Sequence, residues 1–297
     1  MSQGDAYFCI DVSKYDNTKH YNVVRPASLS NPKDNAVMFV TEGFISHWEA
    51  VLTVKDCLVI WPEKIEVPDE LAQRHVVVLS PEPRYGFAQF FYDNKVTYNT
   101  MPKPFAMVGG AYICEGAQIG NDTVVFPGAY IDGEVMIGDN CYIASGVRLV
   151  GRVRIGNNCI IRENTVIGSD GLTTRRNSAG KVITIPQFGG VTIEENVQIG
   201  ANSVICKGAI DDTVIGSGSR IDNETFISHN VHMGRDTLVV GETLMMGSSS
   251  TGERVFISGD SVIRDGVHIG DDAFIGMGSV VVKDVSDGTV VKGNPAK

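Results

Sequence analysis

A repeat of six residues dominates this chain between Ile113 and Val281. The repeated position is aliphatic in nearly every hexad, and only Thr251 interrupts it in the last run. Its aliphatic members are Ile113, Ile119, Val125, Ile131, Ile137, Ile143, Leu149, Ile155, Ile161, Ile167, Ile193, Ile199, Ile205, Ile215, Ile221, Ile227, Met233, Val239, Met245, Ile257, Ile263, Ile269, Ile275 and Val281. A six-residue period fits neither the 3.6-residue turn of a helix nor the alternation of an isolated strand. Such a short, persistent period is typical of a solenoid of short strands and turns, a parallel β-helix.

The repeat also indicates how this solenoid is stabilised. Three hexads form one triangular coil of about eighteen residues, and each hexad supplies a short strand and a corner. The aliphatic side chains point inward and stack on their counterparts in neighbouring coils, so a continuous apolar column is buried. Gly and Asn suit the corners because they tolerate a positive φ.

The composition restricts the partners and the chemistry that we expect. A net charge of −10 over 297 residues argues against nucleic acid or an anionic membrane as a partner. The six cysteines contain no C-x-x-C pair and the six histidines form no three-His zinc set, so we expect no bound metal. No apolar run reaches the length of a membrane span and no basic–apolar leader opens the chain. We therefore expect a cytoplasmic protein.

The first hundred residues have no six-residue repeat. Apolar runs at 36–40, 56–61 and 75–80 alternate with segments of helical spacing at 43–54 and 83–94. Strands that alternate with helices predict a small α/β domain over residues 1–100. The segment 95–106 contains two prolines and is predicted to be a linker, which places the β-helix domain at 107–297.

Several segments resemble a known family. The hexads resemble those of the left-handed β-helix acyltransferases. The run RPASLSNPKDNAVMFVTEGF (25–44), the run VIGSDGL (166–172) and the long segment 184–234 are similar to UDP-3-O-acylglucosamine N-acyltransferase of lipid A synthesis. This resemblance implies a left-handed β-helix, a homotrimer, a nucleotide-linked amino sugar as acceptor and a thioester donor. It implies no bound cofactor. Physical rules alone would have predicted the right-handed form.

The resemblance implies a nucleobase site in the first domain. In that family a Phe-Val-Asn-Pro-Lys-Tyr-like segment lays aromatic rings on uracil, and here the segment is Phe39-Val40-Thr41-Glu42-Gly43-Phe44. The aromatic residues are kept, but Thr41 stands in place of Asn and Phe44 in place of Tyr. Uracil, thymine and another base therefore stay open, as does an ordinary core role for Phe39 and Phe44.

His229 is the candidate catalytic residue. It is third in its hexad, between the inward-facing Ile227 and Val231, so its side chain faces outward. An amine that attacks a thioester loses a proton, and imidazole titrates near neutral pH. The resemblance makes the histidine of the His-Asn-Val segment a general base in a cleft between subunits. A surface histidine without a role is the alternative.

Other residues are candidates for binding the substrates. The resemblance implies acceptor contacts from Asn230 and from Gln187, which lies in the excursion 169–190 that interrupts the hexads. It also implies that Asp222 and Asn223, one hexad before His229, either contact the sugar or orient the histidine. Backbone groups around Gly247, one coil after His229, are expected to hold the oxyanion. The alternative for the excursion is a surface loop with no role in binding.

The end of the chain and its middle resemble families that use different acyl donors. The tail VVVKDVSDGTVVKGNPAK (280–297) resembles the ending of CoA-dependent hexapeptide acetyltransferases, and Asp265-Gly266 replaces a Gly-His segment of the lipid A family. Lys283, Lys292 and Lys297 are expected to bind donor phosphates, with solvated lysines as the alternative. The donor is therefore acyl-CoA or an acyl-carrier protein.

These features predict an acyltransferase that acylates the amine of a nucleotide-linked amino sugar. Two competing hypotheses are a CoA-dependent sugar O-acetyltransferase and a non-catalytic β-helix that binds nucleotide sugars.

Overall fold

The computed structural model describes residues 6–96 and 104–297. The chain divides into two compact units. Unit 1 contains Met1–Thr100 and Leu172–Phe188, and unit 2 contains Met101–Gly171 and Gly189–Lys297. Leu172–Phe188 thus lies with unit 1, although the hexads of unit 2 flank it in sequence. Most of the predicted linker, residues 97–103 of 95–106, lies outside the described residues.

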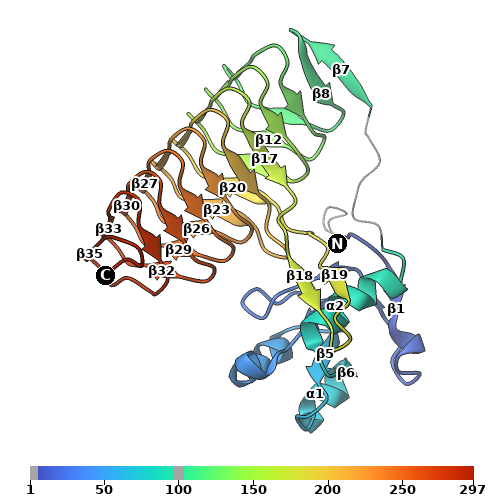
Figure 1. Cartoon of the computed structure of the whole chain (residues 1–297). Coiled ribbons are helices and arrows are strands. Elements are labelled where there is room, and N and C mark those ends of the chain that lie inside the picture. Colours follow the sequence, from blue (N-terminus) through green and yellow to red (C-terminus); the bar gives the residue numbers. More distant parts are fainter. Residues whose placement is uncertain (1–5, 97–103) are drawn as a thin grey trace. The chain divides into compact units, whose positions relative to one another are not determined.

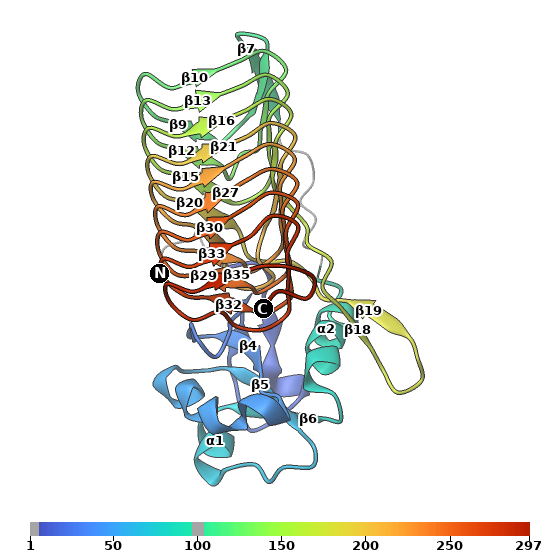
Figure 2. The same ribbon diagram turned by 60° about the vertical axis from the view of Figure 1, so that its left-hand side comes forward.

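Unit 2 is a parallel β-helix, with its coils stacked one on another (Figure 2). Residues one coil apart pair in register, as Ile131 does with Leu149 and Val239 with Ile257. Its strands form three sheets, which we call the β8, β9 and β10 faces after their first members in the repeat (Figure 1).

The β8 face consists of β7 (Phe105–Val108), β8 (Ala111–Cys114), β11 (Tyr130–Ile131), β14 (Arg148–Leu149), β17 (Val166–Ser169), β22 (Val204–Cys206), β25 (Phe226–Ile227), β28 (Leu244–Met245), β31 (Val262–Ile263) and β34 (Val280–Val281). The β9 face consists of β9 (Gln118–Ile119), β12 (Met136–Ile137), β15 (Val153–Ile155), β20 (Val191–Ile193), β23 (Thr213–Ile215), β26 (His232–Met233), β29 (Ser250–Thr251) and β32 (His268–Ile269). The β10 face consists of β10 (Val124–Val125), β13 (Tyr142–Ile143), β16 (Ile160–Ile161), β21 (Gln198–Ile199), β24 (Arg220–Ile221), β27 (Leu238–Val239), β30 (Phe256–Ile257), β33 (Phe274–Ile275) and β35 (Val290–Val291).

The repeated aliphatic residues form the core of unit 2, as the sequence predicts. Ile131, Ile143 and Ile227 are completely buried and belong to one continuous cluster. Thr251 is also buried, and its hydroxyl accepts a hydrogen bond of 3.0 Å from the Gly234 N–H. A polar side chain is therefore accommodated in the column because it has a partner.

The corners have the positive φ angles that the sequence predicts. Asn140 has a φ of 56°, Asn158 a φ of 58° and Asn230 a φ of 58°. Glu224 and Arg254 occupy the same hexad position with positive φ, although their residue types do not favour it. Stacking on neighbouring coils therefore imposes the corner geometry even where the local sequence opposes it.

Unit 1 contains a parallel sheet in the order β3-β4-β5-β6, which confirms the predicted small α/β fold. Its elements are β1 (Ile10–Asp11), the 3₁₀ helix η1 (Val12–Lys14), β2 (Asn22–Val23), β3 (Arg25–Pro26), β4 (Ala36–Phe39), the 3₁₀ helix η2 (Glu42–Thr53), β5 (Leu58–Pro62), α1 (Asp69–Arg74), β6 (Val76–Ser80), α2 (Pro83–Asp93), β18 (Thr174–Arg176) and β19 (Val182–Thr184). Strands β18 and β19 form an antiparallel hairpin. Phe188, after the hairpin, contacts Phe91 of α2 with ring centroids 4.8 Å apart.

Candidate active site

The irregular turns of the β-helix all lie on one edge of the prism. We call it the His229 edge: the turns that lead from the β8 face to the β9 face. The excursion after β17, the longer turn between β22 and β23 and the turn that carries His229 occur there in successive coils. Regular hexads form the other edges of these coils, so the departures from the repeat converge on the neighbourhood of His229.

His229 lies in a notch formed by two glycines, one from a coil before its own and one from the coil after it. A Cβ atom added to Gly247 would lie 2.5 Å from the Cε1 atom and 2.6 Å from the Nε2 atom of His229. A Cβ added to Gly171 would lie 2.7 Å from the His229 Cβ atom. Only residues without a side chain leave room for the imidazole here, so these glycines fix where the ring sits. The ring itself is only half-buried.

Asn230 orients the imidazole. Its Oδ1 atom lies 3.2 Å from His229 Nδ1 and accepts a bond of 3.1 Å from the Ala209 N–H. The Asn230 N–H donates to Thr213 Oγ1 at 2.9 Å, which anchors the turn. Because Asn230 Oδ1 is an acceptor, it selects the tautomer with a proton on Nδ1. The lone pair is then on Nε2, the atom that faces Gly247.

Two carboxylates, Asp212 and Asp170, form ion pairs that support the irregular turns beside His229. The Asp212 carboxylate lies 2.6 Å from an Arg152 nitrogen and accepts bonds from the Gly190 N–H at 2.8 Å and the Thr192 hydroxyl at 2.9 Å. Lys207 Nζ lies 2.6 Å from an oxygen of Asp170, the residue before the notch glycine at 171. Neither cluster can be recognised in the sequence, because each joins residues from different coils.

The Gly247 backbone has the property expected of an oxyanion donor. In the described part of the chain its N–H donates to no acceptor, whereas the N–H of the next residue, Ser248, donates to the His229 carbonyl at 2.9 Å. An unused N–H beside the candidate base is available to a substrate. The oxyanion role of Gly247 stays a prediction.

The described residues contain no group of His, Cys, Asp or Glu that would hold a metal.

Asp222 and Asn223 lie on a different edge from His229. They follow β24 in the turn from the β10 face to the β8 face, which we call the Asp222 edge. Asn223 Oδ1 accepts from the Ala201 N–H at 2.7 Å, and Asp222 Oδ1 accepts from the Asn223 N–H at 2.8 Å. Within one chain these residues support a corner and do not meet His229, so a site that contains both needs two copies of the chain.

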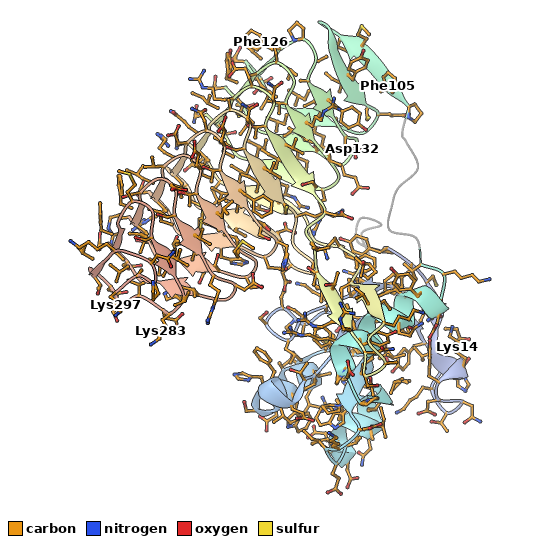
Figure 3. All side chains as sticks on the ribbon, in the orientation of Figure 1. Lys14, Phe105, Phe126, Asp132, Lys283 and Lys297 are labelled. Atoms are coloured by element: carbon orange, nitrogen blue, oxygen red, sulfur yellow. The ribbon has the colours of Figure 1, made fainter. Side chains whose placement is uncertain are left out.

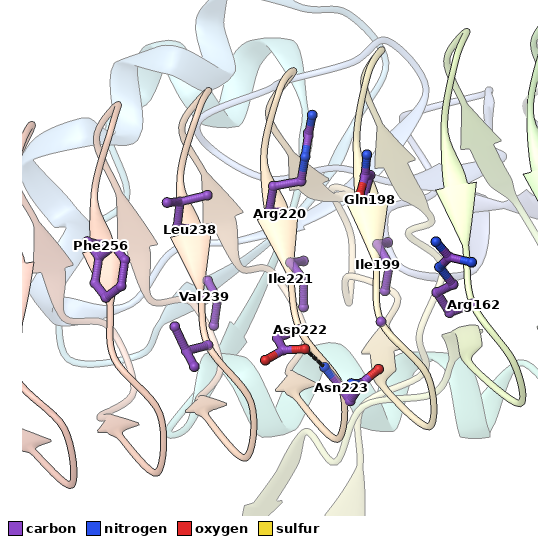
Figure 4. Close-up of a pocket in the computed structure, with 12 residues that line it drawn as sticks. Arg162, Gln198, Ile199, Arg220, Ile221, Asp222, Asn223, Leu238, Val239 and Phe256 are labelled. Carbon is purple, nitrogen blue, oxygen red and sulfur yellow. Dashed lines mark hydrogen bonds between the residues drawn. The ribbon is translucent and has the colours of Figure 1, made fainter.

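A pocket of about 420 Å³ opens on the β10 face beside Asp222 and Asn223 (Figure 4). Arg162, Gln198 and Arg220 line one part of it, and Leu238 and Phe256 line the other. Arg220 is held by carbonyl groups of its own chain, including Asn196 at 2.6 Å. The sequence did not single out this pocket because its residues come from different coils.

The predicted nucleobase residues lie at the carboxyl end of β4 in unit 1. Phe39 is partly buried, and its ring centroid lies 4.9 Å from that of Phe87. Phe44 is 52 % exposed, so it is not a core residue. Thr41 precedes η2 and makes no capping bond with its side chain. Gln187, also in unit 1, donates to the Ile185 carbonyl at 2.9 Å. The binding roles of these residues stay predictions.

The three lysines predicted to bind the donor do not share one edge. Lys283 follows β34 on the His229 edge, three coils from His229, or roughly 14 Å at the spacing of neighbouring strands. Lys292 follows β35 on the Asp222 edge, and its carbonyl accepts from the Lys297 N–H at 3.1 Å. Lys283 and Lys297 both lie at the last coils (Figure 3). Lys283 alone shares the edge of the candidate base.

Comparisons with known proteins support the β-helix. Models of the bacterial transferase hexapeptide (six repeats) match residues 116–151, 134–169 and 248–283, and the hexapeptide repeat of succinyl-transferase matches 190–228. UDP-N-acetylglucosamine acyltransferases from Bacteroides fragilis and Campylobacter jejuni are similar in structure, with TM-scores of 0.59 and 0.57. Each is 24 % identical and covers 65 % of this chain and 73 % of the other. The left-handed β-helix class is thereby confirmed.

Curated relatives are also similar in sequence. The UDP-3-O-acylglucosamine N-acyltransferase of Bordetella parapertussis is 36 % identical over 141 residues, which are 44 % of this chain and 34 % of that protein. The enzyme of the same name from Granulibacter bethesdensis is 48 % identical over 82 residues, 28 % of this chain and 24 % of that protein. The chain thus spans about a third or less of these relatives. The resemblance to this acyltransferase family that the sequence indicates is confirmed over that length.

No helix among the described residues is long and apolar enough to span a bilayer.

Proposed function

We propose that the chain is an acyltransferase that moves an acyl group from a thioester to the amine of a nucleotide-linked amino sugar. The observation that carries the proposal is the position of His229: half-buried, fixed between two glycines and oriented by Asn230, with no hydrogen bond to its Nε2 atom from the described residues. The names of the curated relatives support the nucleotide-sugar acceptor. The thioester belongs to CoA or to an acyl-carrier protein, and both place the reaction in the cytoplasm.

The proposed reaction has the following steps. The acceptor amine attacks the thioester carbonyl carbon, and a C–N bond forms. His229 Nε2 takes the proton that the amine loses, and the Gly247 N–H stabilises the oxyanion. Collapse of the intermediate breaks the C–S bond, and the proton passes from His229 to the leaving thiolate. The balanced step needs neither a redox partner nor a covalent enzyme intermediate.

We also propose that the chain acts as a homotrimer. The outward side chains of the later coils are apolar on two faces: Phe226 and Leu244 on the β8 face, and Phe256 and Phe274 on the β10 face. On the β9 face the outward residues of these coils are His232, Ser250 and His268. Cyclic packing of the β8 face of one copy on the β10 face of the next would cover both apolar faces.

This packing would also complete the site. The His229 edge borders the β8 face, and Asp222 and Asn223 border the β10 face. When these two faces meet, the His229 edge of one copy borders the β10 pocket of its neighbour. The acceptor contacts proposed for Asp222 and Asn223 then come from a second copy of the chain.

The test is acyl transfer by variants at the notch. A UDP-linked amino sugar is incubated with acetyl-CoA or with a long-chain acyl-carrier protein, and thiol release and product mass are measured. In His229→Gln we expect the turnover number to fall by about 10²- to 10⁴-fold because the base is lost. In Gly247→Ala we expect a loss of about 10²-fold because the methyl group displaces the imidazole.

The matched control is Gly259→Ala. Gly259 holds the same hexad position on the Asp222 edge, and its added Cβ would lie 3.1 Å from the nearest atom, the Gly241 carbonyl oxygen. It should keep near-normal turnover. Undiminished turnover in His229→Gln would remove the base from the mechanism. A hydroxylamine-labile product would identify an ester and an O-acyltransferase, and nucleotide-sugar binding without thiol release would favour the non-catalytic alternative.

A further inference from the structure

The parallel sheet of unit 1 gathers several side chains at its carboxyl edge. Phe39 is the last residue of β4, and α2 begins shortly after β6 ends. Because β4 and β6 run parallel, these two ends lie at the same edge, where open α/β sheets usually bind ligands. Arg84, in the first turn of α2, places its guanidinium carbon 5.9 Å from the centroid of the Phe39 ring.

The β18–β19 hairpin brings a second arginine to the same place. Arg175 pairs with Ile183 across the hairpin, and paired residues point to the same face. Ile183 is 8 % exposed, so this face is turned inward. The Asn177 side-chain amide donates to the Tyr85 hydroxyl at 3.4 Å, which ties the hairpin to the first turn of α2. Both views of unit 1 show β18 and β19 beside α2 (Figures 1 and 2).

The two arginines are not neutralised within the described chain. Neither guanidinium lies within 4.0 Å of a carboxylate among the described residues. Burial lowers the pKa of Arg84, and the positive charge of Arg175 lowers it further. Two partly desolvated like charges are unfavourable unless an anion lies between them. The pair is therefore an incomplete arrangement that a bound anion would complete.

We propose that Arg84 and Arg175 bind the phosphate oxygens of a nucleoside diphosphate group, beside the Phe39 ring. Guanidinium groups suit this ligand because their planar N–H donors match phosphate oxygens two at a time. The ligand class rests on the proposed function, in which both substrates offer this chemistry: the nucleotide-linked sugar carries a nucleoside diphosphate, and CoA carries an adenosine diphosphate portion.

The experiment measures binding of four probes to the full chain by calorimetry: UDP, dTDP, coenzyme A and uridine, which has no phosphate. The variants are Arg84→Gln and Arg175→Gln. The control is Arg176→Gln, because Arg176 pairs with Val182 on the opposite, solvent-facing side of the hairpin, where Val182 is 47 % exposed. We expect each test variant to weaken binding of the diphosphate probe by about tenfold or more, and the control to leave it unchanged.

The source of the diphosphate is identified by which probe shows this loss: UDP or dTDP identifies the acceptor, and coenzyme A identifies the donor. Uridine binding should be the same in all variants. A second measurement needs no ligand. At low ionic strength, Arg84→Gln and Arg175→Gln should unfold at a higher temperature than the wild type, because the repulsion is removed. Diphosphate binding that is equal in the wild type and both test variants, or absent from the wild type, overturns the proposal.

The readout separates this proposal from the proposed function. A wild-type protein that binds UDP through the arginine pair but acylates no acceptor would contradict the acyltransferase alone. Acyl transfer with an unchanged KM for the nucleotide sugar and for the donor in Arg84→Gln would contradict the arginine site alone.

Discussion

At the scale of single residues, the sequence suggests His229 as the candidate base, but it does not show the notch in which His229 lies. Its place in the hexad indicates that it faces outward. The notch depends on Gly171 and Gly247, which are 76 residues apart in sequence and both touch the imidazole. Gly247 is recognisable in the sequence because it lies one coil after His229, but glycines are common at the corners of this chain, so nothing in the sequence separates Gly171 from the rest. Only the stacking of coils shows which of them the ring needs.

A buried histidine in unit 1 predicts how that unit responds to pH. His75 is 1 % exposed, accepts a bond of 3.2 Å from the Cys57 N–H and has a pKa that burial lowers. In the unfolded chain its pKa returns to about 6.5. The unfolded state therefore binds more protons below that pH, and the free energy of unfolding falls as the pH drops from about 6.5 toward the folded-state pKa.

The measurement is urea denaturation between pH 7.5 and 5.5, followed by tryptophan fluorescence. Both tryptophans, Trp48 and Trp61, lie in unit 1, so the emission reports on this unit. We expect His75→Asn, which keeps a hydrogen-bond acceptor but does not titrate, to lose less stability over this pH range than the wild type. An identical pH dependence in both proteins would show that another group is responsible.

At the scale of elements, the helix predicted at 43–54 is present as the 3₁₀ helix η2 (Glu42–Thr53). A period of three residues and one of 3.6 differ little over so short a segment, so hydrophobic spacing cannot distinguish them. The irregular turn between β22 and β23 is a different case. The sequence shows that the repeat is broken there, but the partners of Asp212 are Arg152, directly before β15, and Thr192 of β20.

We predict that Asp212 stabilises this turn. Its side chain is 17 % exposed, and its removal leaves the partly buried Arg152 without its ion-pair partner. Asp212→Ala should lower the free energy of unfolding by about 2 kcal/mol, less than a fully buried ion pair would lose. Circular dichroism during urea denaturation measures the change in the β-helix.

The control for this prediction is Asp272→Ala. Asp272 also pairs with an arginine, Arg254 at 2.7 Å, but both side chains are about half exposed. Solvent screens exposed pairs, which therefore contribute little, so this variant should be nearly as stable as the wild type. If both variants lost the same stability, burial of the Asp212 cluster would not be the cause.

At the scale of the whole molecule, the outward side chains of the three faces predict how copies of the chain assemble. A charge on the apolar β8 face should disrupt packing between copies, whereas the same charge on the β9 face should not. We expect light scattering to give three times the chain mass of 32.0 kDa for the wild type and for His232→Lys. Leu244→Lys should give a smaller mass, because burial of a lysine against the next copy is unfavourable. A trimer that Leu244→Lys leaves intact would exclude the β8 face from the interface.

The sequence by itself determined the β-helix and strands β4, β5 and β6 of unit 1, and it pointed to His229 as the candidate base. These features rest on local periodicity and on the chemistry of single side chains, which need no knowledge of distant contacts. The tertiary structure decided what lies together: the two glycines at His229, the separate edges of His229 and Asp222, and the arginine pair of unit 1. Arg84 and Arg175 are 91 residues apart, and Arg175 reaches unit 1 because its hairpin leaves the β-helix. A repeat determines its own period, but an interruption of the repeat carries no local signal of where it folds.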